Sequence, residues 1–240
     1  MHRCSFLIHL PNIKSRFKIM EVRYFINEKD IKSTFGVYVA ASEGVLDLPK
    51  IKDFTRQDWH EYHGTLVDLE PPRLQEREIT LDCFINAENQ LDFIQKINLF
   101  YAEFLKGGFK RLRIEIGDDV PPLIYDTYLK DSIKITKQWG DGSQQGKFKI
   151  KLAEPNPQKK ILKFTAAAGA LTCSLHIQTP MSVIITWGDN TRTEEIFSDG
   201  FDAVHTYGEP GIYYISIGGV ISEITDLEID EQTEVIWQIL

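Results

Sequence analysis

One short stretch of the sequence gathers side chains that could bind a metal ion or take part in catalysis. It reads His60-Glu61-Tyr62-His63 and follows Trp59 directly. Two imidazoles and a carboxylate can ligate zinc, but the H-E-x-x-H spacing that places both imidazoles on one helix face is missing. We therefore interpret the stretch as an amphipathic loop or interface segment, with a metal site as the lesser alternative.

Carboxylates elsewhere do not form a recognisable catalytic pattern. Asp118-Asp119 precedes a proline pair and is typical of a solvated turn, whereas acid and base catalysis needs carboxylates in different environments across a cleft. No G-x-S-x-G motif surrounds a serine, and no glycine-rich phosphate-binding loop occurs. The sequence therefore predicts no catalytic residues, no cofactor and no enzymatic activity. An enzyme with an unrecognised site, lined by His60 and His63, stays the weakest alternative.

Three aspartates near the C-terminus could supply oxygen ligands to calcium. Asp189, Asp199 and Asp202 lack the alternating spacing of a dedicated calcium loop, so the sequence predicts no metal site there. His205 lies close to them in sequence. We expect its side chain to hydrogen bond to a neighbouring loop and not to ligate a metal.

Charge is distributed unevenly along the chain. The 240 residues contain 27 Lys and Arg against 35 Asp and Glu, a net charge of −8. Residues 160–240 hold 3 basic and 12 acidic residues, a net of −9, which leaves a net of +1 for residues 1–159. An acidic segment repels phosphate backbones, so nucleic acid is an unfavourable partner. No apolar run approaches the roughly 20 residues needed to cross a bilayer, and the N-terminus makes a poor signal peptide.

Cysteine usage indicates neither a disulfide framework nor a zinc site. Cys4, Cys83 and Cys173 are far apart, odd in number and outside any C-x-x-C pair. We expect reduced and mostly buried thiols.

One long helix and many strands are predicted. The helix spans about residues 87–106, with apolar residues at three- and four-residue steps, Asn86 as its N-cap and Gly107-Gly108 at its C-terminal end. Its apolar stripe is wide enough to be covered by a sheet, a neighbouring subunit, or both. Strands with alternating or β-branched patterns are predicted at residues 35–41, 77–85, 111–116, 123–130, 132–138, 147–152, 161–165, 171–179, 182–187, 203–207, 212–217 and 222–229. This order favours a mainly β fold, a β-sandwich or barrel with one long flanking α-helix.

The sequence divides near Pro155-Asn156-Pro157. Two prolines cannot join a sheet ladder, and the charge balance changes at this point. We predict an N-terminal arm at residues 1–19, a sandwich with a flanking helix at 20–158, and a small β-sandwich at 159–240. The apolar end of the chain, from Trp237, either completes that second sandwich or docks on another chain.

Two stretches of the second sandwich carry a family resemblance. Residues 185–191 read I-T-W-G-D-N-T, and residues 204–217 read V-H-T-Y-G-E-P-G-I-Y-Y-I-S-I. They resemble the W-G-D-G-[ST] turn and the H-x-Y-x-x-x-G-x-Y strand of PKD-type domains, which are immunoglobulin-like β-sandwiches. Asn190 stands where that family usually has glycine, and asparagine also adopts left-handed conformations.

The first sandwich shows a broader resemblance, in the order of its elements. From about Met20 to Glu154 the chain has G-V-Y-V, an extended acidic and aromatic stretch ending H-G-T-L-V-D, then R-E-I-T-L, a long helix, Gly-Gly and paired strands. This resembles the N-terminal domain of phage distal tail proteins. The resemblance implies a structural subunit of a tail or baseplate ring, found in the virion tail and contacting copies of itself and other tail proteins.

These observations lead to a non-enzymatic structural or adaptor subunit that self-associates through its first domain and presents an acidic PKD-like module. The predicted interface residues are aromatic, apolar or close to polar groups, as contact surfaces commonly are. They are Trp59, His60, Tyr62 and His63 in the aromatic stretch, and Phe93, Leu99 and Phe100 on the helix. The alternative is a surface module that binds carbohydrate or protein, because PKD-like sandwiches also accompany extracellular enzymes and adhesins.

Overall fold

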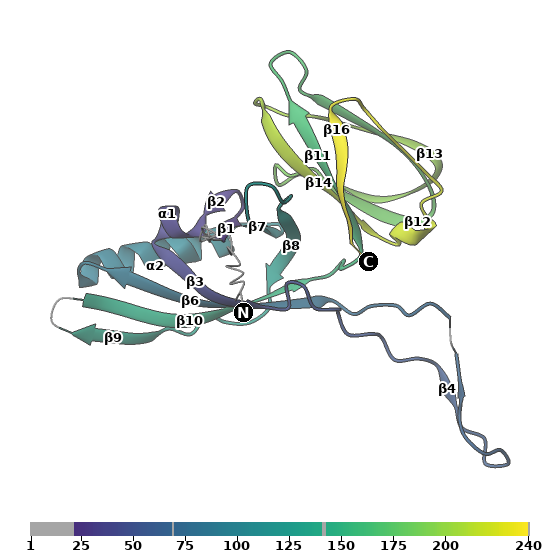
Figure 1. Ribbon diagram of the computed structural model, residues 1–240, viewed down its shortest axis with the longest axis horizontal. Helices are drawn as coiled ribbons and strands as arrows, with labels where there is room; N and C mark the ends of the chain where they lie inside the picture. Colours follow the sequence, from purple (N-terminus) through teal and green to yellow (C-terminus); the bar gives the residue numbers. More distant parts are fainter. Residues whose placement is uncertain (1–21, 69, 141–142, 240) are drawn as a thin grey trace, which may run out of the picture.

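Two antiparallel β-sheet units, each with its own hydrophobic core, make up the protein in this computed structural model (Figure 1). The structure describes residues 22–68, 70–140 and 143–239. We call residues 22–154 the first unit and residues 159–239 the second unit. The chain is mainly β, as predicted, with few helices.

The first unit is an eight-stranded sheet flanked by two helices. Its strands follow the order β2-β1-β7-β8-β10-β6-β3, and β9 pairs with the free part of β10. The elements are β1 (Arg23–Ile26), β2 (Lys29–Asp30), α1 (Ile31–Phe35), β3 (Val37–Glu43), β6 (Arg77–Ala87), α2 (Gln90–Phe104), β7 (Lys110–Glu115), β8 (Leu123–Leu129), β9 (Thr136–Gly140) and β10 (Ser143–Glu154).

Strand β6 shows why this sheet has one buried face. Its alternate residues Ile79, Leu81, Cys83 and Ile85 are buried, because successive side chains of a strand point to opposite sides. Helix α2 covers that side, and Phe100 at its centre is fully buried among aromatic side chains. A mainly β unit with a long flanking helix is therefore observed.

Helix α2 begins later than predicted. Strand β6 continues to Ala87, and the side chain of Asn89, not Asn86, caps the helix by accepting a hydrogen bond from the backbone N–H of Asp92 at 2.9 Å. The predicted N-cap was wrong because the tertiary pairing of β6 with β10 extends the strand as far as Ala87.

Residues 45–68 and 70–76, which we call the arm, form a two-stranded ribbon that extends away from both units (Figure 1). Strands β4 (Arg56–Gln57) and β5 (Leu66–Val67) pair near its end, and the backbone N–H of Lys52 donates to the carbonyl of Arg73 at 2.7 Å. Few arm side chains are buried. The arm therefore extends the surface of the first unit outward and contributes few side chains to its hydrophobic core.

The second unit is a six-stranded antiparallel sheet that folds around its own core. Its strands follow the order β13-β12-β14-β11-β16, and β15 pairs with β12. The elements are β11 (Lys159–Ala166), β12 (Thr172–Thr186), β13 (Arg192–Thr206), β14 (Gly211–Gly219), the short helix η1 (Ile221–Glu223), β15 (Asp226–Ile229) and β16 (Thr233–Ile239). Its core contains Trp187, Tyr207 and Phe164 with aliphatic residues from the paired strands.

The end of the chain completes the second sheet. Strand β16 pairs with β11, and Trp237 on it also packs against the core of the first unit and donates from its indole N–H to the carbonyl of Pro122 at 3.0 Å. Of the two alternatives for this apolar end, the first is thus confirmed. A domain boundary at residue 158 stays a prediction, although β10 ends at Glu154 and β11 starts at Lys159.

Candidate assembly surfaces

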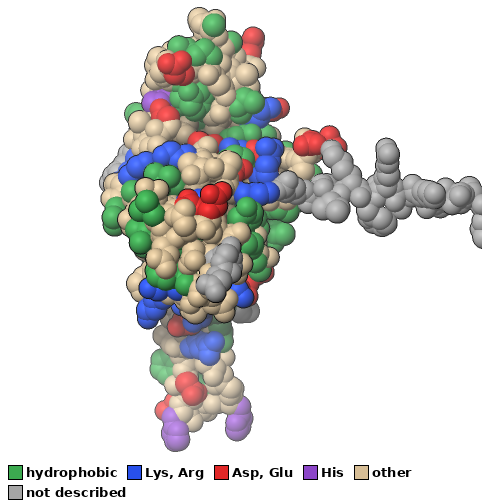
Figure 2. Space-filling view, turned by 90° about the vertical axis from the view of Figure 1, so that its left-hand side faces the viewer, with side chains coloured by type: hydrophobic (Ala, Val, Ile, Leu, Met, Phe, Trp, Pro, Cys, Tyr) green, Lys and Arg blue, Asp and Glu red, His purple; other side chains and the backbone are tan. Residues whose placement is uncertain are grey.

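The tip of the arm brings together the four predicted residues of the aromatic stretch. Trp59, His60, Tyr62 and His63 lie between β4 and β5, where the chain reverses direction. All four are exposed, Tyr62 to 75% of its full area. Trp59, Tyr62 and His63 line a shallow hollow at the tip together with Leu66, which is also exposed. Figure 2 shows histidine side chains at the lower end of the molecule, where the arm points away from the rest.

The root of the arm is held by buried polar groups. Arg77 is 4% exposed, and its guanidinium donates to the backbone carbonyls of Gly44 and Asp47. The hydroxyl of Tyr125 donates to the carbonyl of Val45 at 2.6 Å. Gly44 adopts φ +80°, and a Cβ there would lie 1.9 Å from the carbonyl oxygen of Glu78. The first residues of the arm are therefore fixed in direction by the core.

The arm root connects to the segment that links the two units. The Nε of Arg77 lies 3.2 Å from Glu154, and Glu154 also pairs with the buried Lys159. Burial raises the pKa of Glu154 and lowers the pKa of Lys159, since both lose hydration. The ion pair between them offsets part of this loss, and it anchors the linker segment to the first unit.

Helix α2 places the other predicted interface residues on two different sides. Phe93 and Phe100 are buried in the first core, so they are not available for the interface that was predicted for them. Leu99 is exposed, as are Leu91, Ile94 and Leu105. The core takes the Phe93–Ile97–Phe100 side because bulkier aromatic side chains fill the space beneath the sheet. An unpartnered apolar stripe is left on the outer side of the helix.

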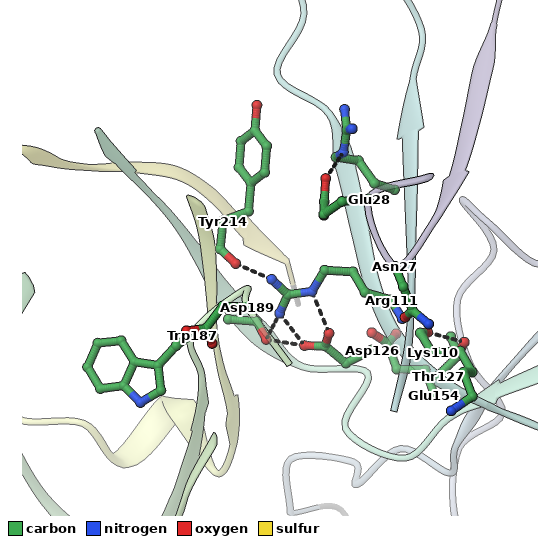
Figure 3. Close-up of polar contacts among 12 residues, drawn as sticks. Asn27, Glu28, Lys110, Arg111, Asp126, Thr127, Glu154, Trp187, Asp189 and Tyr214 are labelled. Carbon is green, nitrogen blue, oxygen red and sulfur yellow. Dashed lines mark hydrogen bonds and ion pairs between the residues drawn. The ribbon is translucent and has the colours of Figure 1, made fainter. Parts of the chain in front are cut away.

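A buried polar junction joins the two units, and the sequence pattern did not single out its residues. Arg111 on β7 forms an ion pair with Asp126 on β8 at 2.8 Å and donates to the carbonyl of Tyr214 on β14 (Figure 3). The hydroxyl of Ser216 also donates to Asp126. Burial alone would raise the pKa of Asp126, but the positive charge and hydrogen bonds of Arg111 outweigh burial and lower it. The sequence did contain one signal for this junction, because Arg111 and Asp126 are charged residues within predicted strands.

The W-G-D-N turn of the second unit faces this junction. Gly188 has φ +97°, and a Cβ on it would lie 2.7 Å from the carbonyl oxygen of Tyr214 and 2.9 Å from a guanidinium nitrogen of Arg111. Asn190 has φ +71°, so the expected left-handed asparagine is confirmed. The turn can approach the first unit closely because residue 188 has no side chain.

His205 is bound as predicted, to the neighbouring turn. Its Nε2 lies 2.7 Å from a carboxylate oxygen of Asp189, and its ring stacks on Trp187 with centroids 4.9 Å apart. Asp189 also accepts from the backbone N–H of Thr191 at 3.0 Å. Burial opposes the charge on Asp189, but hydrogen bonds from Thr191 and His205 lower its pKa. These contacts have a structural purpose, which is to hold the turn against the strand.

Metal centres, reactive thiols and membrane-spanning helices are three other features to consider in the part of the chain that the structure describes. In that part, no group of three or more His, Cys, Asp or Glu side chains is arranged to hold a metal ion. Cys83 and Cys173 are free and buried, as predicted, and burial raises the pKa of each thiol to about 12. Cys4 lies outside the described residues. None of the described helices combines the length and apolar character needed to cross a membrane.

Comparison with known proteins finds a likeness among solved structures. No protein-family model matches the chain, and no curated protein matches it. Among solved structures, the chain is similar to the Dit (gp 19.1) protein of phage SPP1, described as a paradigm of the hub adsorption apparatus in phages that infect Gram-positive bacteria. The alignment has 9% identity and a TM-score of 0.42, and covers 89% of this chain and 96% of that chain. At these values the likeness assigns no function to this chain.

Proposed function

We propose that this protein is a non-enzymatic structural subunit of a phage or prophage tail or baseplate assembly. It self-associates through the arm tip and the outer side of α2, and presents the acidic second unit beside the ring. The resemblance of the sequence of its first unit to distal tail proteins supports a tail or baseplate as the assembly to which it belongs. The observation that carries the proposal is the arm, which extends a cluster of exposed aromatic side chains away from its own core.

Two physical arguments favour a binding partner for the arm. An isolated two-stranded ribbon is marginally stable in water, and aromatic residues supply much of the binding energy of protein interfaces. Trp59, Tyr62 and Leu66 are all exposed at the tip. A neighbouring subunit would cover this apolar area and order the ribbon at the same time.

The outer stripe of α2 is a suitable surface for the arm of a neighbouring copy. Leu91, Ile94 and Leu105 are 64%, 47% and 85% exposed. In Figure 1 the arm and α2 extend to opposite sides of the first unit, so the arm of a subunit can reach one neighbour while its α2 receives the arm of another. A contact between two different surfaces of identical subunits closes into a ring when the rotation between copies allows it.

Light scattering after size exclusion, across a concentration series, tests this proposal. We expect a discrete oligomer for the natural chain, and a shift toward monomer for the double variant Trp59→Ser and Tyr62→Ser. The matched control is Phe197→Ser, which removes a ring that is 70% exposed on the second unit. A strict monomer at all concentrations, also in mixtures with tail-tube subunits, would contradict the proposal.

A further inference from the structure

The outward side of strands β10, β6 and β3 carries a groove lined by lysines. Strand β10 buries Phe148 and Ile150 in the core and therefore turns Lys147, Lys149 and Lys151 to the outside. The groove has a volume of about 650 Å³ and also contains Lys134. We call these four lysines the lysine face.

Acidic neighbours neutralise only part of the lysine face. Lys149 pairs with Asp82 at 2.9 Å, and Lys151 lies 3.5 Å from Asp131. Lys147 forms no ion pair with any residue that the structure describes. Four lysines against two aspartates leave the groove positively charged. A partner with carboxylates would therefore be favoured over an apolar one.

The second unit has a complementary acidic face. On the outer side of strands β13, β12 and β15, His176 lies opposite Asp202 on one neighbouring strand and opposite Glu228 on the other, and its Nδ1 is 2.5 Å from a carboxylate oxygen of Asp202. Asp226 lies next along β15, and all three carboxylates are exposed. Leu175 and Ile177 point to the opposite, buried side. We call Asp202, Asp226 and Glu228 the acidic face.

The two faces match in charge and in spacing. Alternate residues of a β-strand are about 6.8 Å apart, so the lysines of β10 and the carboxylates of β15 repeat at the same interval. Within one subunit, no ion pair joins the two faces among the residues that the structure describes, and the contacts between the units include those of Arg111 and Trp237. Lys149 and Lys151 remain 60% and 53% exposed.

We propose that the acidic face of one copy docks on the lysine face of a second copy. This inference rests on the proposed self-association and adds to it a second contact, separate from the arm. The contact joins two different surfaces. In a closed assembly each subunit therefore places its acidic face on one neighbour and accepts the acidic face of another on its lysine face. It also accounts for the unequal charge of the two units, with 12 acidic residues against 3 basic ones after residue 159.

Carbodiimide cross-linking of a mixture of ¹⁴N and ¹⁵N protein tests the contact directly. This reagent joins an amine to a carboxylate only where the two groups touch. We expect mixed-isotope peptides that join Lys147 or Lys151 to Asp226 or Glu228. The link between Lys149 and Asp82 within one copy is the internal control, since these groups lie 2.9 Å apart.

The outcomes separate this inference from the proposed function. An oligomer that gives the internal control but no mixed-isotope link between the two faces would overturn the inference and leave the proposed function standing. A protein that stays monomeric at all concentrations and gives no mixed-isotope link would overturn both. Links from the lysine face to other carboxylates of the second copy would also overturn the inference as stated.

Charge reversal provides a second measurement on the full chain. We expect Lys147→Glu or Glu228→Lys alone to weaken association about tenfold at low salt, and the two together to restore it to within about threefold. Lys160→Glu, which changes a partly exposed lysine on β11 outside both faces, is the control and should leave association unchanged. Failure of the double variant to recover, with its folding intact by circular dichroism, would overturn the inference.

Discussion

Arg111 on β7 donates a hydrogen bond to the backbone carbonyl of Tyr214 on β14, and so ties the two units together across 103 residues of sequence. The same guanidinium forms a two-pronged ion pair with Asp126, through Nε at 2.8 Å and Nη2 at 3.1 Å. Two-pronged pairs fix the plane of both groups. The second unit is thus held in one orientation by a side chain of the first.

Replacing Arg111 with Met should destabilise the protein strongly. Arg111 is 4% exposed, and removing it leaves the carboxylate of Asp126 buried without its partner, which costs about 3–5 kcal/mol. Urea unfolding followed by tryptophan fluorescence measures the loss. Lys163→Met is the control, because the pair of Lys163 with Glu234 is at the surface and contributes less than about 1 kcal/mol. Equal losses in both variants would show that the junction does not stabilise the fold.

Gly146 should not tolerate even a methyl group. A Cβ at this position of β10 would lie 2.8 Å from the ring of Phe93 and 3.0 Å from the side chain of Ile135. The buried ring of Phe93 has little room to move, so Gly146→Ala should lower the free energy of unfolding by about 1–3 kcal/mol. Gly140→Ala on β9 is the control, since its Cβ would meet nothing within 4 Å. Thermal unfolding compares the two, and similar melting temperatures would contradict the prediction.

The hydroxyl of Tyr207 should contribute more to the free energy of unfolding than that of Tyr213, although the two rings stack with centroids 3.8 Å apart. Tyr207 is 1% exposed and donates to the carbonyl of Trp187 at 2.8 Å, whereas Tyr213 donates to the exposed carbonyl of Glu209 at 2.9 Å. Tyr207→Phe leaves a buried acceptor unpaired, which costs about 1–3 kcal/mol. Tyr213→Phe should cost less, because water replaces the donor. Denaturant unfolding of both variants decides, and a larger loss in Tyr213→Phe would refute this account.

The features that the sequence predicted well are local ones. The turn at residues 187–190 could be anticipated because Trp187, Asp189 and Asn190 define its burial, hydrogen bonding and backbone conformation within a few positions. The alternation of buried and exposed residues along β6 was equally predictable, since it depends only on which side of one strand is buried.

Features that depend on distant parts of the chain were not predictable in this way. Helix α2 was expected, but both sides of it are apolar, and only the packing against the sheet decides that Phe100 faces inward and Leu91 outward. Strand β12 was predicted as two strands because Pro180 interrupts it, whereas its irregular pairing with β13 accommodates the break. The pair of Arg77 with Glu154 joins residues 77 positions apart and leaves no local pattern.

The stability of the first unit should depend on Glu103 in a defined pH window. Glu103 on α2 is 3% exposed and accepts hydrogen bonds from Lys106, Lys29 and Asn27 at 2.7–2.9 Å. Burial would raise its pKa, but these bonds outweigh burial and lower the pKa to about 2, from about 4.5. A lowered pKa in the folded state stabilises the protein above pH 4.5, and the contribution is lost as the pH falls toward 2.

Glu103→Gln should therefore lower the free energy of unfolding at pH 7 by about 2–3 kcal/mol. The difference from the natural chain should shrink between pH 4.5 and pH 2, because protonation removes the same charge from the natural glutamate. Urea unfolding at several pH values measures this. Glu223→Gln, on the exposed side of η1, is the matched control. A difference for Glu103→Gln that stays constant down to pH 2 would mean that packing, and not the charge of Glu103, holds α2 to the strands beside it.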